Sequence, residues 1–192
     1  PATEIAGSSG GHVTVGLFDL GGTKDHRAPF KQRTPGTAGA PHSHLPKTFT
    51  CRRRAQGTRC AVIVVDASAV LEILLNSPTG KKVAALLSRP RETLHAPHLL
   101  DVEVAQVLRR YVRTGELDRS RGDQAIADFA LLPIERYPHG ELPDRIWQLR
   151  DYLTAYDATY VVLAEAPEAR LVTCDARLSR AHGHGAEVEL VR

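Results

Sequence analysis

The stretch around Asp66 constrains the fold more than any other part of the sequence. Residues 61–65 are apolar and mostly β-branched, with no polar alternation, so they predict a strand buried on both faces. Helical spacing follows at residues 67–75, which places Asp66 where a strand ends and a helix begins. Open α/β sheets carry their chemistry at that edge. An aspartate in front of a helix is also an ordinary N-cap, so both readings stay open.

Basic residues are concentrated in the first third of the chain. Residues 1–60 carry 9 Lys and Arg against 3 Asp and Glu, and they hold 9 of the 15 glycines. Residues 61–192 carry 16 against 19 and are rich in Ala, Val and Leu. A segment so poor in apolar residues does not bury enough surface to offset its ordering entropy. We therefore expect a disordered basic extension over 1–60 and one globular domain over 61–192.

Cysteine usage and hydropathy indicate where the protein acts. Cys51, Cys60 and Cys174 are odd in number and far apart, which argues against a disulfide framework and suits a reducing cytoplasm. No apolar run approaches the ~20 residues of a membrane helix, and the start of the chain has no signal-peptide pattern. We expect a cytoplasmic protein with no membrane attachment.

From residue 61 onward, strand-like and helix-like segments alternate. We expect strands at 61–65, 93–96, 133–137, 170–174 and 186–191, and helices at 67–75, 81–88, 98–114, 118–132, 143–152, 155–166 and 176–181. This order predicts an α/β fold with a mostly parallel central sheet flanked by helices and joined by right-handed crossovers.

Three further acids stand in places like that of Asp66. Asp175 follows the fourth expected strand, and Asp157 opens a helix three residues after Thr154. Glu103 lies near the start of a long helix, where Asp101 is a rival that periodicity does not exclude. Capping and the helix dipole explain each acid taken alone. Taken together, four carboxylates at one sheet edge repel one another unless a cation neutralises them, and oxygen ligands favour Mg²⁺, with Mn²⁺ as a substitute.

Four segments resemble the PIN domain of VapC-type toxins. They are residues 64–68 (VVDAS), 103–104 (EV), 153–158 (LTAYDA) and 171–178 (LVTCDARL). The resemblance covers residues 61–192 and implies a PIN-like three-layer fold. It also implies a Mg²⁺-dependent endoribonuclease that hydrolyses RNA phosphodiesters with a metal-activated water. Such a protein is the toxin of a type II toxin–antitoxin pair, forms a homodimer and is neutralised by a cognate antitoxin.

The resemblance also assigns roles to individual residues. The residues that match the family's catalytic set are Asp66, Glu103, Asp157, Asp175, Ser68 and Thr173. It implies that the four acids hold the metal, with Asp66 and Asp157 as the main ligands, and that the two hydroxyls orient carboxylates or water. The arginines that are candidates for RNA contact around the crevice are Arg109, Arg110, Arg113, Arg150, Arg177 and Arg180.

Residues 1–60 depart from the family pattern, because such toxins begin almost at the first strand. We interpret the extension as an over-called gene start, with the natural product beginning near Val62 or Val64, and an intact-mass measurement of the native protein would test this. In the domain itself, Tyr156 and Tyr160 are expected in the core, and Trp147 in the core or in a dimer interface.

Two other functions remain to be weighed. A non-catalytic PIN-fold scaffold for RNA or protein would be marked by the loss of an acid, and none is lost. A receiver-like signalling module would need adjacent acids after the first strand and a late lysine. Asp66 has no acidic neighbour, and residues 83–192 contain no lysine, so this alternative ranks below the scaffold.

Overall fold

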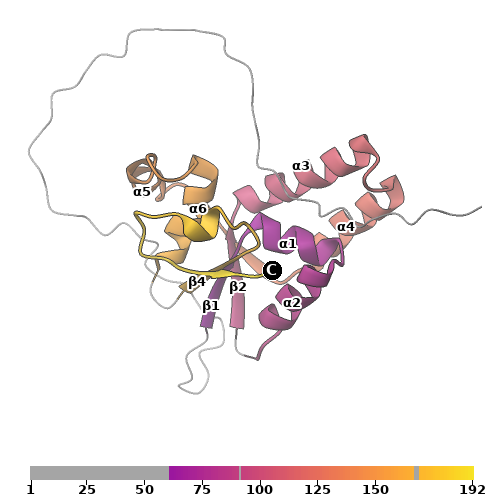
Figure 1. Ribbon diagram of the computed structural model, residues 1–192, viewed down its shortest axis with the longest axis horizontal. Coiled ribbons are helices and arrows are strands. Elements are labelled where there is room, and N and C mark those ends of the chain that lie inside the picture. The colour runs from indigo at the N-terminus through magenta and orange to yellow at the C-terminus, as the bar shows by residue number, and fades with distance from the viewer. Residues whose placement is uncertain (1–60, 91, 167–168) are drawn as a thin grey trace, which may run out of the picture. The chain divides into compact units, whose positions relative to one another are not determined.

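Strands and helices alternate through the part of the chain that the structure, a computed structural model, describes: residues 61–90, 92–166 and 169–192 (Figure 1). The predictions for residues 1–60 lie outside these residues. In chain order the elements are β1 (Ala61–Val65), α1 (Ala67–Leu74), α2 (Pro78–Leu87), β2 (Glu92–Pro97), α3 (Leu99–Thr114), α4 (Arg119–Leu131), β3 (Ile134–Tyr137), α5 (Pro143–Gln148), α6 (Ala155–Ala164), β4 (Ala169–Thr173), the 3-10 helix η1 (Leu178–Arg180) and β5 (Glu187–Leu190).

The five strands form one parallel sheet in the order β3-β2-β1-β4-β5. From the central β1 the chain steps to β2 and β3, and it then returns to β4 and β5 on the other side of β1. Right-handed crossovers therefore place α1–α4 on one face and α5–α6 on the other. In Figure 1 the strands run between the α1–α2 pair and the α5–α6 pair. The reversal makes the border of β1 and β4 a topological switch point, where ligands bind in α/β sheets.

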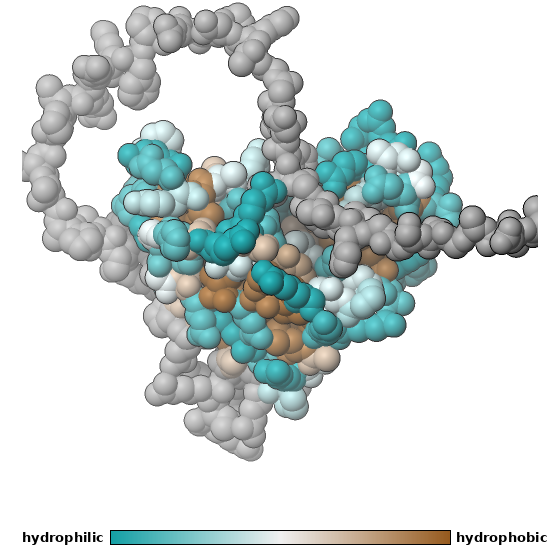
Figure 2. All heavy atoms as spheres, viewed as in Figure 1, coloured by the Kyte–Doolittle hydropathy of each residue, from teal (hydrophilic) through white to brown (hydrophobic). Residues whose placement is uncertain are grey.

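The core lies on both faces of β1. Residues 62–65 are buried without alternation, as expected of a central parallel strand. Helix α6 packs on β1, β2 and β4 and is buried from Ala158 through Ala164, the pattern of a helix surrounded by protein. Figure 2 shows hydrophobic residues gathered near the middle of the described part and hydrophilic residues around them. The predicted α/β fold with a parallel central sheet is confirmed.

Local sequence signals set most helix ends. Thr154 caps α6 by accepting the Asp157 N–H, and Gly115 ends α3 with a φ of 77°, a conformation that costs glycine little. The predicted start of α2 at residue 81 was wrong. The helix begins at Pro78, because the Ser77 hydroxyl caps it and proline suits the first helical position.

Gly80 misled the prediction of α2 because a glycine in this context usually marks a turn. In the structure it lies inside α2, where α1 passes so closely that a Cβ would stand 2.0 Å from the Glu72 carbonyl oxygen. Two other helices are also shorter than predicted. Helix α5 ends at Gln148 rather than at residue 152, and the last helix is a single 3-10 turn, η1.

Tyr156 is not in the core, where the sequence predicted it, and of the two predictions for Trp147 only the dimer interface remains. Trp147 and Tyr156 are exposed, at 69% and 52%, so neither belongs to the core. Aromatic character alone does not report whether a side chain points into the core or into solvent. Tyr160 is buried, as predicted. Among the described helices, none is both long and apolar enough to cross a membrane.

Candidate active site

Asp66 stands at the switch point between β1 and β4. Its N–H donates to the Val172 carbonyl at 3.0 Å, which extends the β1–β4 ladder by one residue. Its side chain caps α1, since Oδ2 accepts the Ser68 N–H at 3.2 Å and the Ser68 hydroxyl at 2.5 Å. The residue is only 7% exposed. Asp66 is thus a helix cap and, at the same time, a buried carboxylate at the carboxyl edge of the sheet.

Two hydroxyl groups connect Asp66 to the end of β4 through hydrogen bonds. The Thr173 hydroxyl donates to Asp66 Oδ2 at 2.9 Å. The two hydroxyl oxygens in turn accept backbone N–H groups, Ser68 from Cys174 and Thr173 from Asp175, both at 2.9 Å. Each hydroxyl has a single proton, so this arrangement points both protons at the carboxylate. Burial raises the pKa of Asp66, while the hydrogen bonds from Ser68 and Thr173 oppose that rise.

The structure distinguishes Glu103 from its rival Asp101. Glu103 is half-buried on α3, and its Oε2 accepts the Tyr160 hydroxyl at 2.5 Å. Asp101 is exposed and forms an ion pair with Arg136 at 3.1 Å. Sequence reasoning assigned Tyr160 to the core and missed its polar contact. The available signal was its position three residues after Asp157 on the same helix, which puts both side chains on neighbouring positions.

Asp157 and Asp175 are both half-buried and held by their own chain segments. The Thr154 hydroxyl donates to Asp157 Oδ2 at 2.8 Å, while the Asp157 N–H donates back to that hydroxyl at 3.1 Å. This resembles the capping box that the sequence allowed, but the Asp157 carboxylate accepts from the Thr154 hydroxyl instead of from the Thr154 N–H. Asp175 Oδ1 accepts the Arg177 N–H at 2.7 Å, which shapes the turn after β4. The local contacts fix where each carboxylate stands.

The four carboxylates act on one another electrostatically. Burial raises the pKa of Glu103 to about 7; the Tyr160 hydrogen bond opposes the rise, and the charges of Asp66 and Asp157 add to it. Burial also raises the pKa of Asp157, and the charges of Asp66 and Asp175 contribute. Like charges raise each other's pKa only at short range. Asp66, Glu103 and Asp157 therefore influence one another in pairs, and Asp175 acts on Asp157.

The six candidate arginines differ in their relation to these acids. The positive charge of Arg177 partly opposes the rise in the pKa of Asp157, which indicates that Arg177 lies on the side of the domain that carries Asp157. Arg110 lies 5.2 Å from the Tyr111 ring centroid, and Arg150 lies 5.2 Å from that of Trp147. The others are exposed side chains on α3 and at the end of η1: Arg109, Arg113 and Arg180.

The chemistry of the donor set fits a hard divalent cation. Among the described residues, no Lys or Arg forms an ion pair with any of the four carboxylates. Within the described part of the chain, no ion pair neutralises these carboxylates, and oxygen donors suit Mg²⁺ or Mn²⁺. Within residues 61–192 as described, no three His, Cys, Asp or Glu side chains form a ready-made ligand set.

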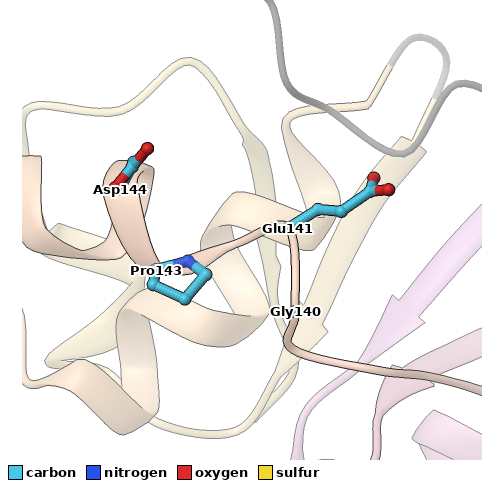
Figure 3. A pocket seen from close by; sticks show the side chains of 4 residues that line it. All are labelled: Gly140, Glu141, Pro143 and Asp144. Atoms are coloured by element: carbon cyan, nitrogen blue, oxygen red, sulfur yellow. The ribbon is translucent and has the colours of Figure 1, made fainter.

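A shallow pocket lies at the start of α5 and is a separate feature. It has a volume of about 340 Å³ and is lined by Gly140, Glu141, Pro143 and Asp144 (Figure 3). Figure 3 shows the Glu141 and Asp144 carboxylates pointing in different directions. None of the four carboxylates of the cluster lines this pocket.

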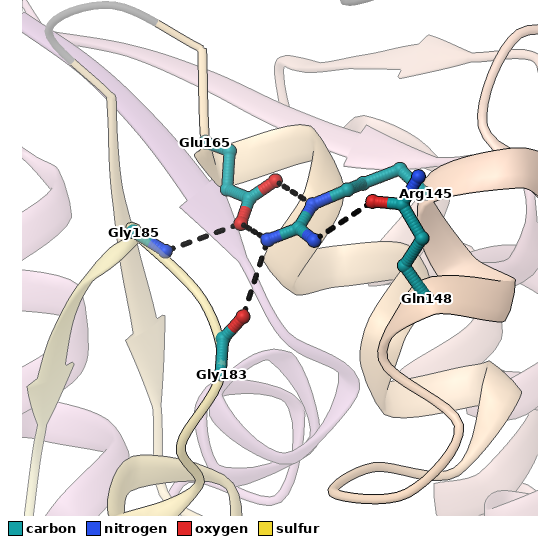
Figure 4. Close-up of polar contacts among 5 residues, drawn as sticks. All are labelled: Arg145, Gln148, Glu165, Gly183 and Gly185. Atoms are coloured by element: carbon teal, nitrogen blue, oxygen red, sulfur yellow. Dashed lines mark hydrogen bonds and ion pairs between the residues drawn. The ribbon is translucent and has the colours of Figure 1, made fainter. Parts of the chain in front are cut away.

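A bidentate ion pair joins α5 to the end of α6. Arg145 donates from Nε and Nη2 to the two oxygens of Glu165 at 2.8 and 2.6 Å (Figure 4). Arg145 also donates to the Gly183 carbonyl at 3.2 Å, and Glu165 accepts the Gly185 N–H at 3.1 Å. The net effect of these partners is to lower the pKa of Glu165, although burial by itself raises it.

Comparison with known proteins now adds to this geometry. Residues 63–183 match the family model of the PIN domain. This chain belongs to the PIN-domain family. Ribonuclease VapC12 of Mycobacterium tuberculosis is 42% identical over 130 residues, which are 68% of this chain and 99% of that protein. Ribonuclease VapC9 of the same organism is 46% identical over 118 residues, 62% of this chain and 89% of that protein.

These matches confirm the predicted PIN domain. They also confirm the predicted similarity to VapC ribonucleases. Among solved structures, PAE2754 from Pyrobaculum aerophilum is similar, with a TM-score of 0.49 and 24% identity over 64% of this chain and 81% of that one. The match to the PIN family model spans Asp66, Glu103, Asp157 and Asp175, so all four carboxylates lie inside the PIN domain.

Proposed function

We propose that this PIN domain is the metal-dependent endoribonuclease of a toxin–antitoxin pair. Its relatives VapC12 and VapC9 are ribonucleases by name, and they are matched along 99% and 89% of their length. The observation that carries the proposal is the buried Asp66 carboxylate, held by the Ser68 and Thr173 hydroxyls at the switch point of the sheet, with the charges of further acids acting on one another around it. A scaffold has no need of such a destabilising arrangement, which active sites retain because function requires it.

Each acid has a proposed part in holding the cation. Asp66 and Asp157 are the main ligands, and Glu103 and Asp175 complete the site directly or through water. Mg²⁺ is the expected ion and Mn²⁺ its substitute, because all the donors are carboxylate oxygens. When bound, such an ion polarises a phosphate and lowers the pKa of a water.

The remaining residues orient the acids and the RNA. The hydroxyls of Ser68 and Thr173 hold Asp66 Oδ2 in place from two elements, which limits the rotation of that carboxylate. Arg177, on the side of the domain that carries Asp157, is the arginine best placed to contact the RNA phosphate near the acids. The exposed arginines Arg109 and Arg113 on α3 and Arg180 after η1 would attract the RNA backbone at longer range, together with Arg110 and Arg150.

The proposed partners follow from the toxin assignment. A cognate antitoxin would cover the acids and block RNA, and the pair would act in the cytoplasm. The homodimer expected from the sequence is part of the proposal. Residues 61–192 are the proposed catalytic unit, with residues 1–60 as an extension to it.

The decisive experiment is cleavage of total RNA by the full chain after removal of any bound antitoxin. Fragments should form with Mg²⁺ and disappear with a chelator or with Asp66→Asn. Asp101→Asn is the matched control: it makes the same chemical change on an exposed acid paired with Arg136, and cleavage should persist. Absence of cleavage by a folded, partner-free wild-type chain would favour the scaffold alternative.

A further inference from the structure

Tyr160 is the one buried polar side chain of α6 that contacts an acid of another helix. It is 1% exposed, so its ring is part of the core, yet its hydroxyl donates to Glu103 Oε2 on α3 at 2.5 Å. A phenylalanine would fill the same volume. Buried tyrosines usually find a partner for their hydroxyl, and here the partner is a carboxylate of the proposed site.

The contact has a fixed direction. Whereas a carboxylate oxygen only accepts, a phenol carries a proton and ordinarily keeps it at neutral pH. It is therefore a permanent donor to Glu103. Helix α6 also carries Asp157 one turn earlier, so a single helix positions one acid directly and a second acid through Tyr160.

We propose that Tyr160 is a positioning residue that holds one oxygen of Glu103 and leaves the other oxygen free to serve the cation, directly or through water. This inference rests on the proposed function. Without the hydroxyl, Glu103 would rotate among several side-chain conformations, and the site would spend less time ready to bind. Groups that orient a metal ligand typically contribute about 10–100-fold to metal affinity or activity.

The test uses Tyr160→Phe in the full chain with Mn²⁺ as the probe. Mn²⁺ binding, followed by electron paramagnetic resonance, should weaken by about 10-fold or more. The kcat of RNA cleavage at a fixed, subsaturating Mn²⁺ concentration should fall similarly, while KM for RNA stays unchanged. Tyr111→Phe is the matched control, because Tyr111 is a buried tyrosine on α3 two turns beyond Glu103 and should leave Mn²⁺ binding unaltered.

A double-mutant comparison separates positioning from a general loosening of the fold. In a Glu103→Ala background, Tyr160→Phe should have no further effect on Mn²⁺ affinity. The same loss in both backgrounds would overturn the inference. So would wild-type affinity in Tyr160→Phe. Tyrosine ¹³Cζ NMR gives an independent readout in a chain that retains Tyr160: Glu103→Ala should shift the Tyr160 signal and leave that of Tyr111 in place.

The outcomes also separate this inference from the proposed function. A wild-type chain that neither binds Mn²⁺ nor cleaves RNA would overturn both. A wild-type chain that does both, beside a Tyr160→Phe variant that equals it, would overturn only the positioning role. If Tyr160→Phe does not fold, an unshifted Tyr160 NMR signal in Glu103→Ala would still count against the contact.

Discussion

Glu103 and Glu165 are two partly buried glutamates whose pKa values move in opposite directions. Burial disfavours the charged form of both. At Glu165 the guanidinium of Arg145 and the Gly185 N–H outweigh burial, and the pKa falls below its usual value. At Glu103 the Tyr160 hydroxyl does not outweigh burial and the neighbouring acids, and the pKa rises to about 7.

The difference shows how a fold uses the same side chain for two purposes. The Glu165 carboxylate is fully paired and joins α5, α6 and the loop before β5, so it stabilises the domain. Glu103 is left with uncompensated charge among Asp66 and Asp157, which costs stability and prepares a place for a cation. A paired carboxylate therefore marks structure, and an unpaired group of them marks a candidate active site.

The largest expected effect is on activity at the unpaired glutamate. Glu103→Gln should lower RNA cleavage by more than about 100-fold, because loss of a group that merely orients a ligand already costs about 10–100-fold. The free energy of unfolding should stay equal or rise, since a repelling charge is removed. Cleavage assays and urea unfolding of the same preparations would check both. If Glu103→Gln lowered the free energy of unfolding and left cleavage intact, Glu103 would be a structural residue like Glu165.

Removal of the paired glutamate should damage the fold instead. Glu165→Ala should lower the free energy of unfolding by about 2–3 kcal/mol. This is below the ~3–5 kcal/mol of a fully buried pair, because the Arg145 side chain is 33% exposed. Urea unfolding measures the loss, and cleavage per folded molecule should remain near the wild-type value. A free energy of unfolding equal to that of the wild type would mean that the ion pair does not stabilise the domain.

Cation binding should affect only the unpaired group. Mg²⁺ at a hundred times its Kd should raise the free energy of unfolding by about 2.7 kcal/mol in the wild type. Asp66→Asn should abolish this gain, whereas Glu165→Gln should keep it on a lower baseline. Thermal unfolding with and without Mg²⁺ would show the difference, and an equal gain in all three proteins would point to a cation site elsewhere.

The two glutamates should also make the free energy of unfolding depend on pH in opposite directions when a chelator is present. Glu103 binds its proton more tightly when folded, so the free energy of unfolding should fall as pH rises from 4.5 to about 7. The slope should stay below the roughly 1.4 kcal/mol per pH unit of one full proton, because Glu103 is partly exposed. Glu165 should lose its contribution as pH falls below 4.5. Glu103→Gln should abolish the first of these pH dependences and Glu165→Gln the second. Urea unfolding of both variants across pH measures this.

The smallest effect is expected at a surface pair. Arg150 and Asp151 lie 3.6 Å apart with side chains 48% and 70% exposed. Asp151→Ala should change the free energy of unfolding by about 0–0.5 kcal/mol, since water and salt screen exposed charges. This variant is the reference for Glu165→Ala, and a loss as large as that of Glu165→Ala would erase the distinction between them.

The sequence by itself determined the order of strands and helices and the class of the fold. The unbroken apolar run at residues 61–65 reports burial on two faces, and period-3.6 spacing reports the amphipathic α3. It also located the four acids at the ends of elements, because parallel strands bring their carboxyl ends to one edge. These features are local or periodic, so they can be read along the chain.

Only the tertiary structure decided which residues meet. It distinguished Glu103 from Asp101, joined Tyr160 to Glu103, and showed Gly80 to be a contact point of two helices rather than a turn. It also paired Arg145 with Glu165 across 20 residues of chain. Such contacts depend on how elements pack across the sheet. A single sequence therefore identifies the residues able to form a site, whereas packing decides which of their charges are neutralised and which are left for a ligand.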